Sequence, residues 1–180
     1  MKNQPVSLFS STVQSPLGTM EAIVAQNRLC LLEFSDRPGL AAERLWLERH
    51  YQCPCKNERT QTHERAFAQL AEYFSGTRTA FDLELEYPGT DFQRSVWAFL
   101  LSVPYGSTMS YGTMAAKLGK PSAARAVAAA IGQNRLAILI PCHRIVGANG
   151  ALTGYAGGLQ RKRQLLELEA GAGIAAKPTD

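Results

Sequence analysis

The chain changes in character at Tyr87-Pro88-Gly89, and this break constrains the fold more than any other feature of its 180 residues. Proline followed by glycine interrupts both helices and strands. Residues 1–87 carry nine Lys and Arg against eleven Asp and Glu, a net charge of −2, whereas residues 88–180 carry ten against four, a net charge of +6. We therefore expect one domain over residues 1–87, a second over residues 88–171, and a flexible tail over residues 172–180.

The basic second half suggests a polyanionic partner, because lysine and arginine side chains that neutralise phosphates release condensed counterions. A surface that is charged only for solubility would have the same composition. The net charge alone does not distinguish a polyanion-binding surface from a surface charged for solubility. The sequence motifs are needed to distinguish them.

The sequence also indicates a reducing compartment. Residues 1–7 lack the long apolar stretch of a signal peptide, and no run of about 18 apolar residues occurs. We therefore expect a cytoplasmic protein with no membrane partner. Its four cysteines (Cys30, Cys53, Cys55 and Cys142) are too irregularly spaced for a disulfide framework, so Cys142 is expected to be a free thiol.

The first half has the periodicities of a small sheet with helices. Residues 13–20 have the pattern of a strand and turn, and strand-like runs follow over residues 20–25 and 29–34 with a turn at Gln26-Asn27 between them. Together they predict an antiparallel meander. Apolar residues at helical spacing predict helices over residues 40–50 and 62–74. A last strand is expected over residues 81–85, where apolar and acidic residues alternate.

Four residues of this half raise a zinc hypothesis: His50, Cys53, Cys55 and His63. The Cys-x-Cys gap is shorter than the spacing usual for zinc ligands, and half of the set would lie on a helix. We therefore expect no metal site here, and no cofactor anywhere in the chain.

The second half contains two short helices joined by a tight turn. Ser110 is expected to cap a helix over residues 111–118 that ends at Gly119, and Pro121 is well placed to start the next helix, over residues 122–131. Such a pair in a basic segment is typical of a helix-turn-helix. The fold class expected for the chain is α+β, with the small sheet domain followed by a mostly helical domain.

The second of these helices is rich in alanine, and Arg125 is its one long charged residue. A helix that reads base edges in the major groove normally carries several Arg, Asn, Gln or Lys side chains. This helix should therefore bind by close fit and phosphate contacts rather than by sequence. An alanine-rich core helix with a solvated arginine is the alternative.

The chemical motif follows an apolar run, residues 136–140, which we expect to be a buried strand leading into Pro141-Cys142-His143-Arg144. A cysteine is a nucleophile only as thiolate, and a neighbouring histidine, cation or helix N-terminus lowers its pKa. His143 would point away from Cys142 in an extended chain. A direct contact therefore requires a turn, or else a bridging water.

The segment after this motif is expected to close over it. Asn149-Gly150 predicts a hairpin that folds residues 151–153 back beside the cysteine. The glycine-rich residues 154–158 could form a lid, and a closing helix over residues 159–170 would carry Glu169 on its inner stripe, beside Leu159 and Leu166. The negative end of the helix dipole disfavours a carboxylate there, so a buried partner such as His143 is expected, with a solvated glutamate as the alternative.

These residues resemble a known family. Pro141-Cys142-His143-Arg144-Ile145-Val146 is similar to the signature of the O6-alkylguanine-DNA alkyltransferases, and the similarity runs from about Thr90 to Glu169. The matching segments are Ser110-Tyr111, residues 121–127, Asn134 and residues 154–158. The resemblance implies a ribonuclease-H-like first domain and a winged helix-turn-helix second domain.

The resemblance also implies an activity: irreversible, single-turnover transfer of an alkyl group to Cys142 from O6-alkylguanine, and from O4-alkylthymine, in double-stranded DNA. A monomer would grip the minor groove and flip the damaged nucleotide into a pocket. Arg125 would fill the vacated space in the stack. DNA contacts are implied for Tyr111, Lys120, Ser122, Ala123, Ala124 and Arg125.

The catalytic roles come from the same resemblance. Glu169 would orient His143, which through a water would take the proton from Cys142. Tyr111 would position the base and supply a proton as guanine leaves, and Asn134 would brace the active-site turn. The pocket for the base is implied to be lined by Tyr155, Ala156, Ile145 and Val146. Some relatives carry a polar residue where Ala156 stands, so only a backbone donor is expected at that position.

Three other functions are open to a chain of this pattern. A non-enzymatic binder of alkylated DNA would not need Cys142, which this chain retains. A sequence-specific transcriptional regulator would rest on the helix-turn-helix alone. A Cys-His hydrolase would need an oxyanion hole and a peptide pocket, and no motif in the sequence provides either.

Overall fold

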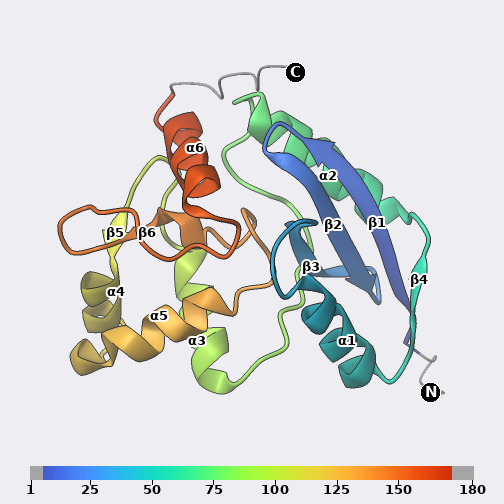
Figure 1. Ribbon diagram of the computed structural model, residues 1–180, viewed down its shortest axis with the longest axis horizontal. Helices are drawn as coiled ribbons and strands as arrows, with labels where there is room; N and C mark the ends of the chain where they lie inside the picture. The colour runs from blue at the N-terminus through green and yellow to red at the C-terminus, as the bar shows by residue number, and fades with distance from the viewer. Residues whose placement is uncertain (1–5, 172–180) are drawn as a thin grey trace.

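The computed structural model describes residues 6–171, and the predicted tail over residues 172–180 lies outside them. Figure 1 shows a sheet with its helices beside a second group of mostly short helices. The first group contains β1 (Leu8–Ser15), β2 (Gly18–Ala25), β3 (Arg28–Phe34), α1 (Leu40–Tyr51), β4 (Cys55–Asn57) and α2 (Gln61–Phe74). The second contains α3 (Asp91–Leu100), β5 (Met109–Ser110), α4 (Tyr111–Lys117), the 3-10 turn η1 (Pro121–Ala123), α5 (Ala124–Gly132), the 3-10 turn η2 (Cys142–Arg144), β6 (Ile145–Val146) and α6 (Leu159–Glu169). The expected α+β class is confirmed.

The sheet contains the predicted antiparallel meander, with strands in the order β3-β2-β1-β4. Gln26 and Asn27 join β2 to β3 with φ of 49° and 64°, the left-handed conformation that two-residue hairpin turns require. The short strand β4 was not predicted. It pairs parallel with β1, and three residues are too few for a period of two to be recognised.

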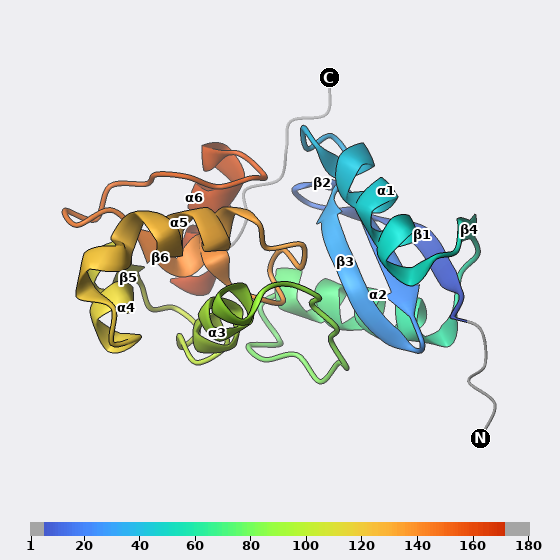
Figure 2. The same ribbon diagram turned by 90° about the horizontal axis from the view of Figure 1, so that it is seen from below.

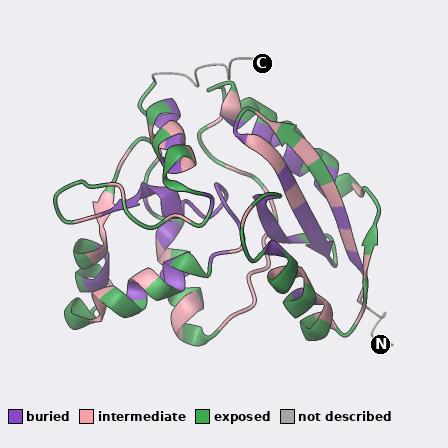
Figure 3. Ribbon diagram, in the orientation of Figure 1, coloured by how far each residue is buried: buried purple, intermediate pink, exposed green. Residues whose placement is uncertain are grey.

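Helices α1 and α2 pack with different sets of residues from the sheet. Leu40 and Leu47 of α1 join one buried cluster with Ile23 and Leu31. The main cluster contains residues of β2, β3 and α2 together with residues of the second half, so the two halves share one core. Figure 3 shows β3 buried along nearly its whole length.

The second group contains the predicted helix-turn-helix. Ser110 caps α4 by accepting a hydrogen bond from the backbone of Thr113, and the next helix begins at Pro121 as a 3-10 turn before it becomes α5. Trp97 of α3 donates its indole N–H to the carbonyl of Ala130 across 2.9 Å, which fixes α5 against α3. Figure 2 shows α4 and α5 on the side of the molecule away from the sheet.

Three predictions of local structure were wrong. Residues 81–85 form no strand and contribute one bridge, Leu85 to Leu29. The run 136–140 forms a buried turn with one bridge, Leu136 to Leu32, because Ile138 takes a left-handed φ of 72°. Residues 151–153 turn back at Gly150 but form no strand. In the first two segments the apolar residues reflect burial rather than pairing.

Candidate active site and nucleic-acid interface

Asn134 organises the turn that presents Cys142. Its amide nitrogen donates to the carbonyl of Ile140 at 2.9 Å and to the sulfur of Cys142 at 3.3 Å, and its side-chain oxygen accepts from the backbone of Leu136 at 3.0 Å. Cys142 then begins η2, with 8% of its surface exposed. The predicted buried strand is replaced by a turn whose backbone groups bond to one another, to β3 and to the side chain of Asn134.

The thiol of Cys142 is protonated in this resting arrangement. Burial raises its pKa to about 11, although the amide of Asn134 and the ammonium of Lys162 act in the opposite direction. The sequence predicted a lowered pKa. The difference arises because the cost of desolvating a thiolate exceeds the stabilisation that these two groups provide. The site can therefore form the nucleophile only if a base removes the proton during the reaction.

His143 is a base of the right kind. Its Nε2 lies 2.7 Å from Oε1 of Glu169, and its Nδ1 is buried with no hydrogen-bond partner among residues 6–171. Burial lowers the pKa of the imidazole, so the ring is neutral near pH 7. Because a neutral ring carries one N–H and a carboxylate accepts it at Nε2, Nδ1 is left with a lone pair able to take a proton.

Glu169 is the centre of this cluster. Its two oxygens accept hydrogen bonds from five groups: Tyr73 Oη (2.8 Å), His143 Nε2 (2.7 Å), Arg144 Nη2 (3.0 Å), Arg144 Nε (2.9 Å) and the backbone N–H of Gly106 (3.1 Å). Burial alone would raise the pKa of Glu169, but the bonds from His143 and Arg144 lower it to about 2. The carboxylate therefore stays ionised throughout the pH range in which His143 titrates.

Tyr111 lies beside this site because β5 pairs with β6. Met109 and Ser110 run parallel to Ile145 and Val146, which follow η2 directly, so the start of α4 lies next to the cysteine segment. The hydroxyl of Tyr111 donates to the carbonyls of Thr153 and Gly154, at 3.3 and 3.4 Å. Burial raises its pKa, so Tyr111 remains a proton donor.

Lys162 ties the same loop to the helix α6. Its fully buried ammonium donates to the carbonyls of Ile145 and Thr153, at 2.5 and 2.6 Å, and lies 6.0 Å from the centre of the Tyr111 ring. With a longer bond to the carbonyl of Gly154, at 3.4 Å, it joins the strand that follows the cysteine to the start of the expected lid. A buried amine is tolerated there because backbone carbonyls accept its hydrogens.

The residues expected to line the base pocket differ in their exposure. Ile145 and Val146 are buried, Ala156 is exposed, and Tyr155 is half-buried with its hydroxyl enclosed. The loop is tightly packed at Gly157, where a Cβ would lie 2.8 Å from the Tyr155 ring and 2.9 Å from Phe34. Only glycine fits at that position, so the loop and the sheet are in direct contact.

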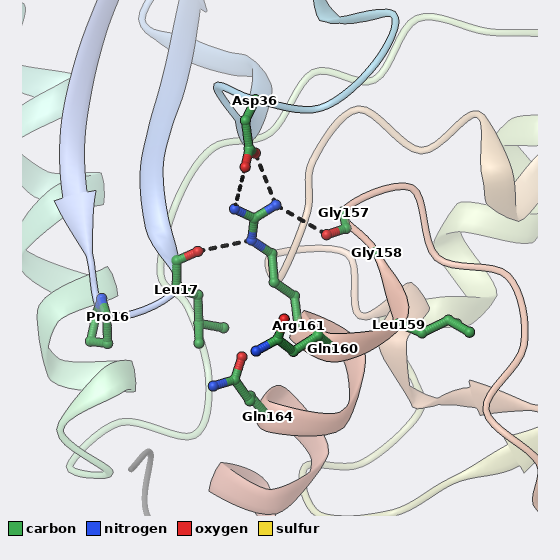
Figure 4. Close-up of a pocket in the computed structure, with 9 residues that line it drawn as sticks. All are labelled: Pro16, Leu17, Asp36, Gly157, Gly158, Leu159, Gln160, Arg161 and Gln164. Atoms are coloured by element: carbon green, nitrogen blue, oxygen red, sulfur yellow. Dashed lines mark hydrogen bonds and ion pairs between the residues drawn. The ribbon is translucent and has the colours of Figure 1, made fainter. Parts of the chain in front are cut away.

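Arg161 fixes that loop to the first half of the chain, as Figure 4 shows. Its guanidinium forms two bonds with Asp36, at 2.8 and 2.9 Å, and donates to the carbonyls of Leu17 and Gly157. It also lies over the ring of Phe34, 4.2 Å from the centre. A cavity of about 370 Å³ adjoins this contact, and its lining includes Gly157, Gly158 and Gln164.

The residues expected to contact DNA lie on the helix-turn-helix. Lys120, Ser122 and Arg125 are exposed, while Ala123 and Ala124 are partly buried. Val127, Ala130 and Ile131 form the inner face of α5. The exposed part of this helix is consequently smooth apart from Arg125, as the composition predicted.

The four residues of the zinc hypothesis have other contacts or lie apart. His63 completes the capping box of α2 with Thr60 and contacts the carbonyl of Ala22 through Nε2, at 3.2 Å. His50 stacks on Trp46, and Cys53 and Cys55 are free thiols. Within residues 6–171 no group of three or more His, Cys, Asp or Glu could hold a metal ion. In the same range, none of the helices has the length and apolar character needed to cross a membrane.

Comparison with known proteins identifies the family. The profile of the ribonuclease-like domain of 6-O-methylguanine DNA methyltransferase matches residues 8–87, and the profile of the DNA binding domain of the same protein matches residues 91–171. The chain belongs to the 6-O-methylguanine DNA methyltransferase family. The fold class implied by the sequence resemblance, a ribonuclease-like domain followed by a winged helix-turn-helix, is thereby confirmed.

This chain is similar to individual members of the family over different lengths. A methylated-DNA–protein-cysteine methyltransferase of Mycobacterium bovis is 59% identical over 104 residues, which are 58% of this chain and 63% of that protein. One from Mycolicibacterium paratuberculosis is 44% identical over 162 residues, 88% of this chain and 90% of the relative. The alignment with the M. bovis relative therefore spans less than two thirds of its length.

Two solved structures of the family are similar in three dimensions. A crystal structure of Mycobacterium tuberculosis OGT in complex with DNA has a TM-score of 0.80 and 41% identity, and the match covers 93% of this chain and 96% of that one. The O6-methylguanine-DNA methyltransferase of Pyrococcus kodakaraensis has a TM-score of 0.67 and 25% identity over 90% of this chain and 98% of that one.

Sequence reasoning missed three residues of the site: Tyr73, Arg144 as a partner of Glu169, and Lys162. Arg144 was within the quoted motif, and its burial could have been suspected from the apolar residues around it. The others come from segments far from Cys142 in sequence. No local pattern marks such residues, because their roles depend on how the two halves pack.

Proposed function

We propose that this protein repairs DNA by direct reversal, moving an alkyl group from O6 of guanine, or O4 of thymine, onto the sulfur of Cys142. The observation that carries the proposal is the buried series Asn134, Cys142, His143 and Glu169, in which a donor contacts the sulfur and a neutral imidazole is held by a carboxylate. Family membership and the name of the M. bovis relative support the same activity.

The reaction begins with removal of a proton from the thiol. Nδ1 of His143 takes that proton through a bridging water, and Glu169 stabilises the resulting imidazolium. The freed electron pair on sulfur attacks the alkyl carbon, a C–S bond forms, and the bond between that carbon and O6 breaks. Asn134 stabilises the thiolate through its N–H.

The departing base receives a proton from Tyr111, whose hydroxyl is protonated at neutral pH and adjoins the loop over the site. Guanine then leaves as a neutral base, and the proton taken by His143 restores the phenol through solvent. The product is a thioether. No described residue near Cys142 is arranged to cleave a C–S bond, so each molecule reacts once.

DNA is bound in the minor groove by a monomer, through α4, the turn and α5. The contacts come from Tyr111, Lys120, Ser122, Ala123 and Ala124. The small side chains let the helix backbone approach closely, and the damaged nucleotide flips out at a cost of a few kcal/mol of lost stacking and pairing. Arg125 fills the space left in the stack.

The flipped base occupies a pocket formed by Ile145, Val146, Tyr155 and the backbone of Ala156. In this scheme residues 1–87 form a supporting domain, and residues 88–171 bind DNA and accept the alkyl group. Arg161 and Gly157 lie at the contact between them, so the loop over the pocket is positioned by both.

The test is transfer of a labelled methyl group from duplex DNA containing O6-methylguanine to the full chain, compared with a Cys142→Ser variant. Label on the wild type and none on the variant supports the proposal. No label on a folded wild type rejects it. If Cys142→Ala protects alkylated cells as well as the wild type does, the chain is a non-enzymatic binder instead.

A further inference from the structure

Tyr73 connects the first half of the chain directly to the catalytic carboxylate. It lies on α2, is fully buried, and donates its hydroxyl to Oε1 of Glu169 across 2.8 Å. That oxygen is the one that accepts from Nε2 of His143. Of the five hydrogen bonds to Glu169, this is the one that comes from the first half.

We propose that Tyr73 is a positioning residue of the alkyl-transfer site: its hydroxyl shares the charge of Glu169 with His143, and so keeps the imidazole a neutral base. The inference rests on the proposed function, since it assigns a role within the same proton relay. It also gives the first half a part in the chemistry, because among residues 88–171 no tyrosine hydroxyl donates to this oxygen.

Three donors compete for one oxygen of Glu169. Oε1 of Glu169 accepts from Tyr73, His143 and Nη2 of Arg144. Each donor withdraws negative charge that would otherwise stabilise an imidazolium at His143. With the phenol in place, burial is the largest influence on His143 and lowers its pKa. Without the phenol, the carboxylate would favour the protonated ring more strongly.

The remaining charged and titratable groups at this cluster do not depend on the phenol. Arg144 contacts both oxygens of Glu169, and its positive charge disfavours an imidazolium, as does that of Lys162. Tyr105 packs edge-on against Tyr73, with 6.1 Å between ring centres, and donates to the carbonyl of Leu168 rather than to Glu169. These groups stay in place when only the Tyr73 oxygen is removed.

The direct experiment is Tyr73→Phe in the full chain, with Tyr105→Phe as the matched control that removes a hydroxyl from the same aromatic cluster. The rate of Cys142 alkylation by free O6-benzylguanine is measured from pH 5.5 to 9. We expect the acid limb for Tyr73→Phe to move to higher pH by up to about one unit, which is a loss of up to about tenfold at acid pH. At high pH, where His143 is neutral in both proteins, the rates should converge.

A purely structural role gives a different result. Loosened packing would reduce the rate at all pH values and leave the midpoint unchanged. An unchanged or lowered midpoint in Tyr73→Phe, or an equal upward shift in Tyr105→Phe, overturns the proposal.

Two further measurements keep the test decisive if Tyr73→Phe folds poorly, and the second of them does not depend on activity. Replacement of Tyr73 by 3-fluorotyrosine keeps the ring and strengthens the donor, so the acid limb should move to lower pH, and a shift to higher pH overturns the proposal. Titration of the His143 ring by NMR should show the same two opposite shifts. If the wild type transfers no alkyl group, the proposed function fails, while the NMR titration still decides whether Tyr73 controls His143.

Discussion

The amide nitrogen of Asn134 donates to the sulfur of Cys142 across 3.3 Å, and the same side chain holds the turn between them. Asn134→Ala should therefore raise the pKa of the thiol further and cost about 1–3 kcal/mol of stability for each buried group left unsatisfied. The thiol pKa is measured by the pH dependence of iodoacetamide reaction, and stability by urea unfolding. Gln133→Ala, at the exposed neighbouring position, is the control. An unchanged thiol pKa in a folded Asn134→Ala would contradict the assigned role.

Arg125 should matter only when a duplex has to be opened. Arg125→Ala should reduce repair of O6-methylguanine in duplex DNA by at least about tenfold, since a vacated stack costs a few kcal/mol to leave unfilled. Reaction with free O6-benzylguanine should be unchanged. Arg49→Ala, which removes an exposed arginine of α1, controls for the loss of one positive charge. Equal losses of rate on both substrates would show that Arg125 does not fill the space left by the flipped base.

The ion pair between Arg144 and Glu169 should be necessary for folding as well as for chemistry. Both side chains are almost wholly buried, so Arg144→Met leaves a carboxylate with fewer donors and should destabilise the protein by about 3–5 kcal/mol. Thermal unfolding measures this loss. Arg163→Met, on the exposed face of α6, should change stability little. If the two variants unfold at the same temperature, Arg144 does not stabilise Glu169.

Stability should also depend on acid pH through Glu169. Its folded pKa, about 2, lies below the ordinary 4.5, so the carboxylate stabilises the fold above about pH 4.5 and this contribution is lost as the pH falls toward 2. Urea unfolding between pH 6 and pH 2.5 should show a fall that is smaller in Glu169→Gln. Equal falls in the two proteins would show that other carboxylates account for acid unfolding.

The contact between Arg161 and Asp36 should control the loop over the site. Arg161→Met keeps an apolar stem over Phe34 but removes the bonds to Asp36, Leu17 and Gly157. We expect faster hydrogen exchange across residues 154–158. We also expect weaker binding of O6-benzylguanine, seen as a higher half-saturating concentration. Exchange at the rate of the wild type would show that Lys162 holds the loop by itself.

The sequence predicted most elements of the fold because their periods are local. The meander, both helices of the first half and the helix-turn-helix follow from spacing and caps within single segments. Residues 136–140 were predicted to form a strand because they are all apolar. That prediction was wrong because an apolar run indicates burial but not strand pairing. There the side chain of Asn134 bonds the backbone of Leu136 and Ile140, and the neighbouring strand β3 contributes one bridge, at Leu32.

The sequence predicted part of the candidate site. The features that it missed all depend on how the two halves of the chain pack together. Cys142 and His143 are adjacent in sequence, and Glu169 could be paired with them from the cost of a buried carboxylate at a helix C-terminus. Tyr73 could not be placed, since it reaches Glu169 only after α2 packs on the second half. The raised pKa of Cys142 was likewise hidden, because desolvation depends on the packed structure.

In repair by direct reversal, one sulfur of each molecule accepts one alkyl group. The most direct measurement is intact-protein mass spectrometry, with peptide mapping, after incubation with excess duplex DNA containing O6-methylguanine. We expect a mass gain of a single CH2 unit on the peptide that holds Cys142, and this gain should not increase with longer incubation. An unmodified Cys142, or a methyl group on Cys30, Cys53 or Cys55 instead, would contradict it.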